Sequence, residues 1–176
     1  MAIREVLQLG NPALREPATP VDDPADPAVA AVLDDLRDTL AHWRETTGYG
    51  RGIAAPQIGV PRRIVFLNVD GHSPWPLLNP AIVARSPETM VVWDACLCFL
   101  SIFFQVARHR WVDVRYQDTA GAWRELRADG DLSELLQHEI DHLDGVLAID
   151  RLTDVRTICT REEFERRYRA ASPYAR

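Results

Sequence analysis

The sequence contains no lysine: all 20 of its basic residues are arginine. This absence excludes Schiff-base chemistry, serine–lysine nucleophile pairs and the lysine with which a P-loop holds phosphates. Any catalysis must therefore depend on cysteine, histidine, carboxylate, hydroxyl or arginine side chains, or on a metal ion.

The chain also lacks long apolar runs and has little cysteine. No run approaches the ~20 apolar residues of a membrane-spanning helix, and the N-terminus does not resemble a signal peptide. Three cysteines are too few for a disulfide framework. We therefore expect a cytoplasmic protein with no membrane contact. The net charge of −6 argues against a broad nucleic-acid surface, so no direct DNA binding is expected.

The length and the apolar pattern predict one domain of the α+β class. A chain of 176 residues is the size of a single domain, taken here as 1–176. Helices are expected over 27–43, 131–144 and 161–171. Asp26 as the N-cap and Pro27 as the first helical residue mark the start of the first helix, and Gly145 closes the second. Short strands are expected over 64–69, 77–78, 82–83, 90–97, 111–116 and 123–126. Because the strands are grouped before a helix rather than alternating with helices, we expect mainly antiparallel sheet.

The strongest chemical signal is the run His138-Glu139-Ile140-Asp141-His142. Residues four apart share a helix face, so His138 and His142 can present two imidazoles to one ion. Glu139 stands where a general base would act on water at that ion. The alternative is a surface helix whose histidines pair with carboxylates. Leucines around most of this helix instead predict burial, which favours a metal site.

The residues alone leave the third ligand open. A catalytic site commonly has three protein ligands and one water. The candidates are Cys96, Cys98, Cys159 or a distant carboxylate. Cys96 and Cys98 follow an expected strand, where both thiols can face one side, and their spacing does not choose between them. We interpret the isolated Cys159 as a small apolar residue.

A glycine-rich segment from Gly50 to Gln57 is the third signal. Its small residues permit close approach of another backbone, and the Gln57 amide can donate to a developing oxyanion. The segment is not a dinucleotide fingerprint, because no strand leads into it and no helix follows. On its own the same pattern also suits a tight connection.

Together and in this order, the three segments resemble the peptide deformylase family, whose motifs are GxGxAAPQ, EGCLS and QHExDH. They read GRGIAAPQ over 50–57, DACLC over 94–98 and QHEIDH over 137–142. The segments LGNPALR and LNP resemble further parts of the family, so the resemblance covers about residues 1–152. It implies mainly antiparallel sheets packed around a central metal-binding helix.

The resemblance implies a hydrolase that removes the N-formyl group from the formyl-methionine of nascent polypeptides and releases formate. The implied metal ligands are Cys96, His138 and His142, and the implied acid/base is Glu139. The implied oxyanion donors are the Gln57 side-chain amide and the Leu97 backbone N–H. The implied substrate-binding positions are Gly50, Gly52, Ile53, Asp94, Arg108 and Glu134. The implied ion is Fe(II), with Zn, Ni or Co as substitutes, whereas ligand type alone favours zinc.

The second motif departs from the family at three of its five positions. Asp94 replaces Glu, Ala95 replaces Gly and Cys98 replaces Ser. Because Asp94 is one methylene shorter, we expect its pair with Arg108 to lengthen. The apolar segment over 99–104 that follows predicts either tighter core packing, a reshaped substrate wall or a patch for a partner.

Glu134 lies one turn before His138 on the same helix face, where the family has an apolar residue lining the methionine pocket. We favour a local interpretation, in which Asp131 is the N-cap and Glu134 the N3 residue of a capping box. The alternative is that Glu134 points into the pocket. It would then disfavour formyl-methionine and favour a polar or cationic side chain.

Two further functions remain as alternatives. One is a deformylase-like amidohydrolase for another N-formyl substrate, and the other is a non-catalytic metal-binding relative, for which Glu139 would be unnecessary. An ordinary HExxH protease would leave the cysteine motif unexplained. The arginine-rich helix over 161–171 predicts either a solvated helix with internal ion pairs or, by resemblance, a ribosome contact.

Overall fold

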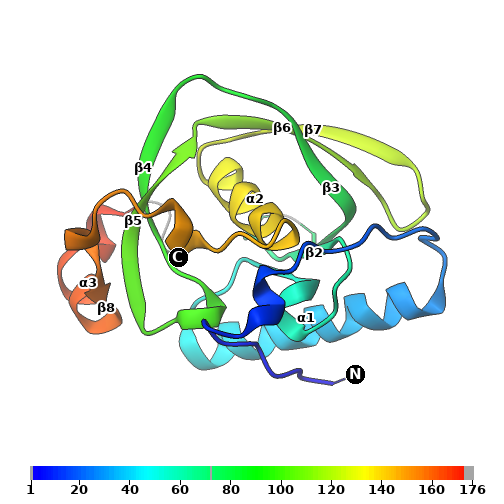
Figure 1. Cartoon of the computed structure of the whole chain (residues 1–176), viewed down its shortest axis with the longest axis horizontal. Helices are drawn as coiled ribbons and strands as arrows, with labels where there is room; N and C mark the ends of the chain where they lie inside the picture. The colour runs from blue at the N-terminus through cyan, green and yellow to red at the C-terminus, as the bar shows by residue number, and fades with distance from the viewer. Residues whose placement is uncertain (1, 72, 173–176) are drawn as a thin grey trace.

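Two antiparallel sheets surround a central helix in the computed structural model, which describes residues 2–71 and 73–172 (Figure 1). One sheet has five strands in the order β1 (Gly52–Ala54), β2 (Ile64–Leu67), β3 (Trp75–Arg85), β6 (Trp111–Gln117) and β7 (Trp123–Asp129). The other has three, β4 (Thr89–Asp94), β5 (Ile102–His109) and β8 (Cys159–Thr160). This arrangement confirms the α+β class.

The central helix α2 (Gly130–Leu143) is buried from Ser133 to Leu143, and the strands enclose it in Figure 1. Its bounds agree with the expected helix to within one residue. Gly145 follows with a φ of 72°, and a Cβ there would collide with the carbonyl oxygen of Arg15. Only glycine accepts both the positive φ and the close carbonyl oxygen, and a glycine directly after this helix is what the sequence predicts.

The expected capping box at the start of α2 is wrong. The N-cap residue is Asp129, which makes no side-chain cap hydrogen bond, and the helix begins at Gly130. Asp131 and Glu134 are therefore both inside the helix, and Glu134 is 3% exposed. A side chain that far along the helix does not reach the free N–H groups of the first turn.

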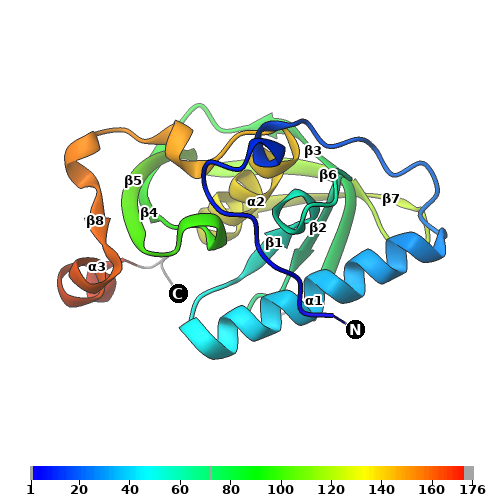
Figure 2. The same cartoon turned by 60° about the horizontal axis from the view of Figure 1, so that its bottom comes forward.

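Helix α1 (Pro27–Thr47) crosses beneath the larger sheet in Figure 2. It begins as the sequence predicts, because the Asp26 carboxylate accepts a hydrogen bond from the Ala28 N–H at 2.8 Å and Pro27 is the first helical residue. It ends four residues later than expected, at Thr47, and Gly48 is its C-cap. Its apolar face, with Leu36 and Leu40 fully buried, closes the core below β1 and β2.

Strand β5 occupies the apolar segment in which no strand was expected. Phe104 packs in the main core, whereas Phe103 on the opposite face packs against Phe164 near the C-terminus. From Phe104 to His109 buried residues alternate with more exposed ones, but the buried residue at position 108 is an arginine and the strand starts with three apolar residues, which hides the alternation in the sequence. The buried phenylalanines show that this segment contributes to the core.

The C-terminal helix α3 (Arg161–Arg167) is shorter than expected, and a 3₁₀ turn over Arg169–Ala171 follows it. Phe164 is fully buried and stacks on Phe103 with ring centroids 4.2 Å apart. Trp93 contacts both Phe164 and Tyr168. Among the described residues, no helix combines the length and apolar character required to cross a bilayer.

Candidate metal centre and its cavity

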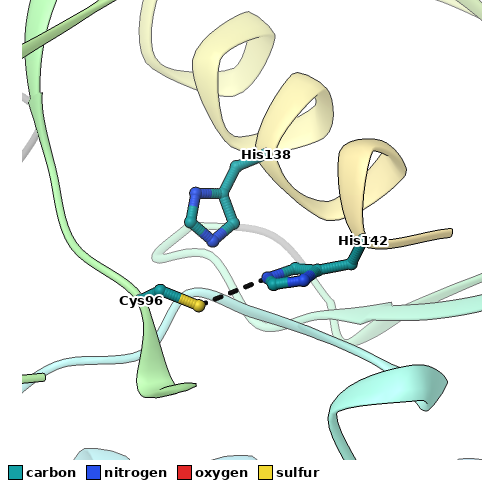
Figure 3. Close-up of side chains that lie close together, drawn as sticks. All are labelled: Cys96, His138 and His142. Carbon is teal, nitrogen blue, oxygen red and sulfur yellow. Dashed lines mark hydrogen bonds between the residues drawn. The ribbon is translucent and has the colours of Figure 1, made fainter. Parts of the chain in front are cut away.

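Three potential metal ligands converge from two elements (Figure 3). Helix α2 places His138 and His142 one turn apart, and Cys96 follows directly after β4. One ligand atom from each residue lies within 4.8 Å of the others, and Cys96 Sγ is 3.3 Å from His142 Nε2. All three side chains are buried. A thiol and two imidazoles are donors that bind zinc and other transition metals, so the residues fit such an ion.

Asp94 holds the first imidazole in place. Its Oδ1 lies 2.9 Å from His138 Nδ1, and its Oδ2 accepts from Arg108 Nη2 at 2.9 Å. The expected lengthening of the Asp94–Arg108 pair is therefore wrong, because the backbone places the shorter acid within hydrogen-bond reach. With Nδ1 engaged, Nε2 is the ring nitrogen left for an ion. Arg108 also donates to Asp141 at 2.5 Å, which ties the network to α2.

Burial and charge raise the pKa of two of the ligands and lower that of the third. Burial by itself lowers the pKa of His138, but the Asp94 carboxylate outweighs it and raises that pKa to about 9. Burial, reinforced by His138, holds the pKa of His142 well below its usual range. Burial raises the pKa of the Cys96 thiol. A cation would supply the positive charge that a buried thiolate needs and would displace the proton of His138 Nε2.

Glu139 faces the same centre with one oxygen free. Its Oε2 is buried and has no hydrogen-bond partner among the described residues. A buried carboxylate oxygen without a partner is costly, so a water molecule or substrate atom is expected beside it. Burial raises the pKa of Glu139 to about 7. The backbone of Gly52 lies so close to Glu139 that a Cβ on Gly52 would be 2.6 Å from Glu139 Oε1.

Gln57 presents its amide nitrogen to the two cysteines. The backbone N–H of Ala54 donates to Gln57 Oε1 at 2.8 Å, which fixes the orientation of the amide. Gln57 Nε2 lies 3.5 Å from Cys96 Sγ and 3.6 Å from Cys98 Sγ. Cys98 is buried but lies outside the group of three ligands, so the structure separates two thiols that spacing could not.

A cavity of about 70 Å³ opens beside these residues. It is lined by most of the expected site residues: Gly50, Gly52, Gln57, Asp94, Cys96, Leu97, Glu134, His138 and Glu139. Two expected substrate-binding side chains are not in its wall. Ile53 is fully buried in the core, and Arg108 lies behind Asp94.

The cavity wall also holds residues that the sequence did not single out. Leu100 and Phe103 come from the apolar segment, which agrees with the interpretation of a reshaped wall. Tyr49 and Trp93 complete an aromatic side, and neither carried a signal in the sequence. Arg51 lies within the glycine-rich segment, where the sequence pattern indicated no role of its own for it.

Glu134 takes part in the cavity wall through an ion pair. Arg51 Nη2 donates to Glu134 Oε2 at 2.6 Å, and Arg51 Nη1 lies 3.4 Å from Asp131 Oδ2. The alternative interpretation of Glu134, as a residue of the pocket, therefore agrees with the structure.

A second group could in principle hold an ion. Carboxylate oxygens of Asp94 and Glu134 and a nitrogen of His138 lie within 4.8 Å of one another. However, Arg108 already neutralises Asp94, and Arg51 already neutralises Glu134. The group of Cys96, His138 and His142 has no such competing cation and is the better site.

Known proteins resemble both the sequence and the fold. The family model described as polypeptide deformylase matches residues 3–157. A peptide deformylase from Thermotoga neapolitana is 37% identical over 153 residues, covering 87% of this chain and 89% of that protein. One from Desulfitobacterium hafniense is 40% identical over 151 residues, covering 86% and 95%. The crystal structure of the Thermotoga maritima peptide deformylase aligns with a TM-score of 0.81 and 34% identity, covering 88% of this chain and all of that one.

An antiparallel α+β fold with a buried HExxH helix and a cysteine beside it defines a metal-dependent hydrolase. More narrowly, the chain belongs to the peptide deformylase family. It is an enzyme of that family, whose members act on formylated nascent peptides and use a single catalytic metal ion. The resemblance found in the three sequence motifs is thereby confirmed.

Proposed function

We propose that the chain hydrolyses the N-formyl group of formyl-methionyl peptides, with Cys96, His138 and His142 holding the ion. One observation carries the proposal: Glu139 lines the cavity beside the candidate ligands, and its buried Oε2 has no hydrogen-bond partner among the described residues. When bound, the ion would supply Lewis acidity toward a water molecule and toward the formyl oxygen.

Glu139 acts as the general base and then as the general acid. It accepts a proton from the water molecule while the water oxygen forms a bond to the formyl carbon. The Gln57 amide and the Leu97 N–H donate to the formyl oxygen as that oxygen gains negative charge. Glu139 then delivers the proton to the amine nitrogen as the C–N bond breaks. One water and one formamide thus become formate and a free amino terminus.

The peptide backbone would lie along an open sheet edge. Strand β1, which begins at Gly52, is an edge strand of the larger sheet, and Gly50 and Gly52 both line the cavity. We assign Gly50, Gly52 and Ile53 to backbone contacts of this kind, in which the Ile53 side chain stays in the core. We assign Asp94 and Arg108 a positioning role behind His138.

The ion in the cell, the extent of the domain and the compartment belong to the same proposal. We propose Fe(II), with Zn, Ni or Co as substitutes, because thiolate and imidazole ligands accept all four. Metal analysis of anaerobically purified protein would identify the ion. Residues 1–176 would form one catalytic domain. It would act in the cytoplasm, where formylated nascent peptides are made.

Contact between α3 and the ribosome is a separate proposal. Helix α3 begins beyond the matched residues 3–157, and Arg166 and Arg167 are exposed. Both arginines also pair with Glu163, which lowers the charge that they offer to RNA. Co-sedimentation of the full chain with ribosomes should show binding that is lost when residues 161–176 are removed. Equal sedimentation of both forms would exclude this contact.

Replacing Glu139 tests the proposed reaction. The variant Glu139→Ala should retain its metal and lose deformylation of formyl-Met-Ala-Ser by at least about 100-fold, because general acid–base catalysis contributes 10²–10⁴. Formate release and metal content are the two measurements. Glu125→Ala, which removes an exposed carboxylate on β7, is the matched control and should keep its activity. Activity of Glu139→Ala within tenfold of the wild type would refute the role of Glu139.

A different N-formyl substrate is the second candidate. The observation that favours it is the ion pair between Arg51 and Glu134 in the cavity wall, because a thioether side chain offers this pair no strong partner.

A further inference from the structure

The cavity wall next to the candidate ligands carries an ion pair that is almost removed from solvent. The side chains of Arg51 and Glu134 are 16% and 4% exposed, and both line the cavity. A carboxylate oxygen of Glu134 lies within 4.8 Å of a His138 ring nitrogen. A substrate whose formyl group lies at the ion would therefore place a neighbouring side chain close to this pair.

The pair has hydrogen-bonding capacity to spare. A guanidinium has five N–H donors, and those of Arg51 make two hydrogen bonds within residues 2–71 and 73–172, to Glu134 and Asp131. Over the same residues Glu134 accepts one hydrogen bond, at Oε2. The pair can thus still donate through Arg51 and accept through Glu134 Oε1.

We propose that Arg51 and Glu134 determine substrate specificity, selecting a neutral carboxamide rather than a thioether in the first side chain of the formyl peptide. The inference rests on the proposed deformylation reaction and favours the second candidate, a different N-formyl substrate, over formyl-methionyl peptides. Glutamine has the length of methionine and ends in a group that can donate to Glu134 and accept from Arg51.

Other side chains match this wall less well. A methionine would cover the pair and displace its water without replacing the lost hydrogen bonds. An acidic side chain would face Glu134, Asp94 and Glu139, and a cationic one would compete with Arg51 for the same carboxylates. The aromatic side of the cavity, with Tyr49 and Trp93, can accept the aliphatic stem of glutamine and methionine alike.

The decisive variant removes both charges together. A single substitution would leave a buried, unpaired charge and could unfold the protein, whereas replacing a whole buried pair by apolar residues is often neutral or stabilising. Arg51→Leu/Glu134→Leu is therefore the test. Arg127→Leu/Asp113→Leu, which removes an exposed pair with two hydrogen bonds of 2.7 Å on β6 and β7, is the matched control.

The assay compares formyl-Gln-Ala-Ser with formyl-Met-Ala-Ser, and adds the formyl-Glu and formyl-Lys peptides, on metal-loaded enzyme. We expect the wild type and the control to favour glutamine over methionine in kcat/KM by about tenfold or more. We expect the double variant to favour methionine. Calorimetric titration of metal-loaded Glu139→Ala, with and without the double substitution, should show the same reversal in Kd.

The outcomes distinguish a failure of the specificity inference from a failure of the proposed function. A wild-type preference for methionine or for a charged side chain, or a double variant with an unchanged ratio, would overturn the specificity inference alone. If no formyl peptide is hydrolysed by metal-loaded wild type, the proposed function fails. The binding ratios of Glu139→Ala would still decide the specificity in that case.

Discussion

Helices α2 and α3 both carry a carboxylate paired with arginine, yet the pKa of the carboxylate shifts in opposite directions. On α3, hydrogen bonds from Arg166 and Arg167 lower the pKa of the exposed Glu163 to about 2. On α2, burial raises the pKa of Glu134, although Arg51 opposes that shift. The same two functional groups therefore give a stabilised anion at the surface and a carboxylate that is costly to ionise in the interior.

The comparison shows where this fold places the ion-paired side chains whose desolvation costs free energy. Buried pairs surround the candidate metal centre: Arg51 with Glu134, and Arg108 with Asp94 and Asp141. Such pairs contribute little net stability, because desolvation offsets their attraction, but they fix side chains in one geometry. The pairs that Arg166 and Arg167 form with Glu163 on α3 are exposed and screened by water.

Of the groups on α2, Glu139 must be placed most accurately for the proposed reaction, and Gly52→Ala tests this. The added Cβ would lie 2.6 Å from Glu139 Oε1 and would push the carboxylate away. Because a displacement of about 1 Å can cost about 100-fold, deformylation should fall by at least that factor while folding and metal content are retained. Gly71→Ala is the control: a Cβ there meets no atom within 4 Å, and the φ of 80° costs stability without displacing a group of the cavity. Unchanged activity of Gly52→Ala would mean that Glu139 has freedom to move.

Arg108→Met tests the buried pairs directly. It would leave Asp94 and Asp141 without their shared arginine, and we expect the free energy of unfolding to fall by about 3–5 kcal/mol. Urea denaturation measures the change. The comparison variant is Arg166→Met on α3, where no measurable change is expected because the pair is exposed. Equal effects of the two variants would remove the distinction between the helices.

The sequence brings the candidate ligands into view because they are local or carried by a motif. His138 and His142 follow from helical spacing, and Asp26 and Gly145 mark helix ends through rules that involve only neighbouring residues. These features need no knowledge of distant contacts, and α2 agrees with its expected position to within one residue.

What the sequence could not predict depends on partners distant in the chain. In β5 the period of two is hidden in the sequence, because Phe103 on the outer face is covered by Phe164 and the inner position 108 is a buried arginine. Glu134 was assigned to a capping box because its partner, Arg51, lies 83 residues away and has no sequence relation to it. Tyr49 and Trp93 enter the cavity wall only through the packing of β4, β5 and α3.

The smallest predicted effect concerns Glu163 on α3. Its pKa of about 2 is below the usual value of 4.5, so its pairs contribute stability above pH 4.5 and lose that contribution as the pH falls toward 2. NMR titration of the Glu163 carboxyl carbon should therefore show a midpoint well below 4.5 at low salt. In about 1 M salt the Debye length is about 3 Å, so the midpoint should rise toward the usual value. A midpoint at 4.5 in both conditions would show that the arginines leave Glu163 unaffected. The buried pair of Arg51 and Glu134 should not respond to salt, because ions do not enter the cavity wall between the two groups.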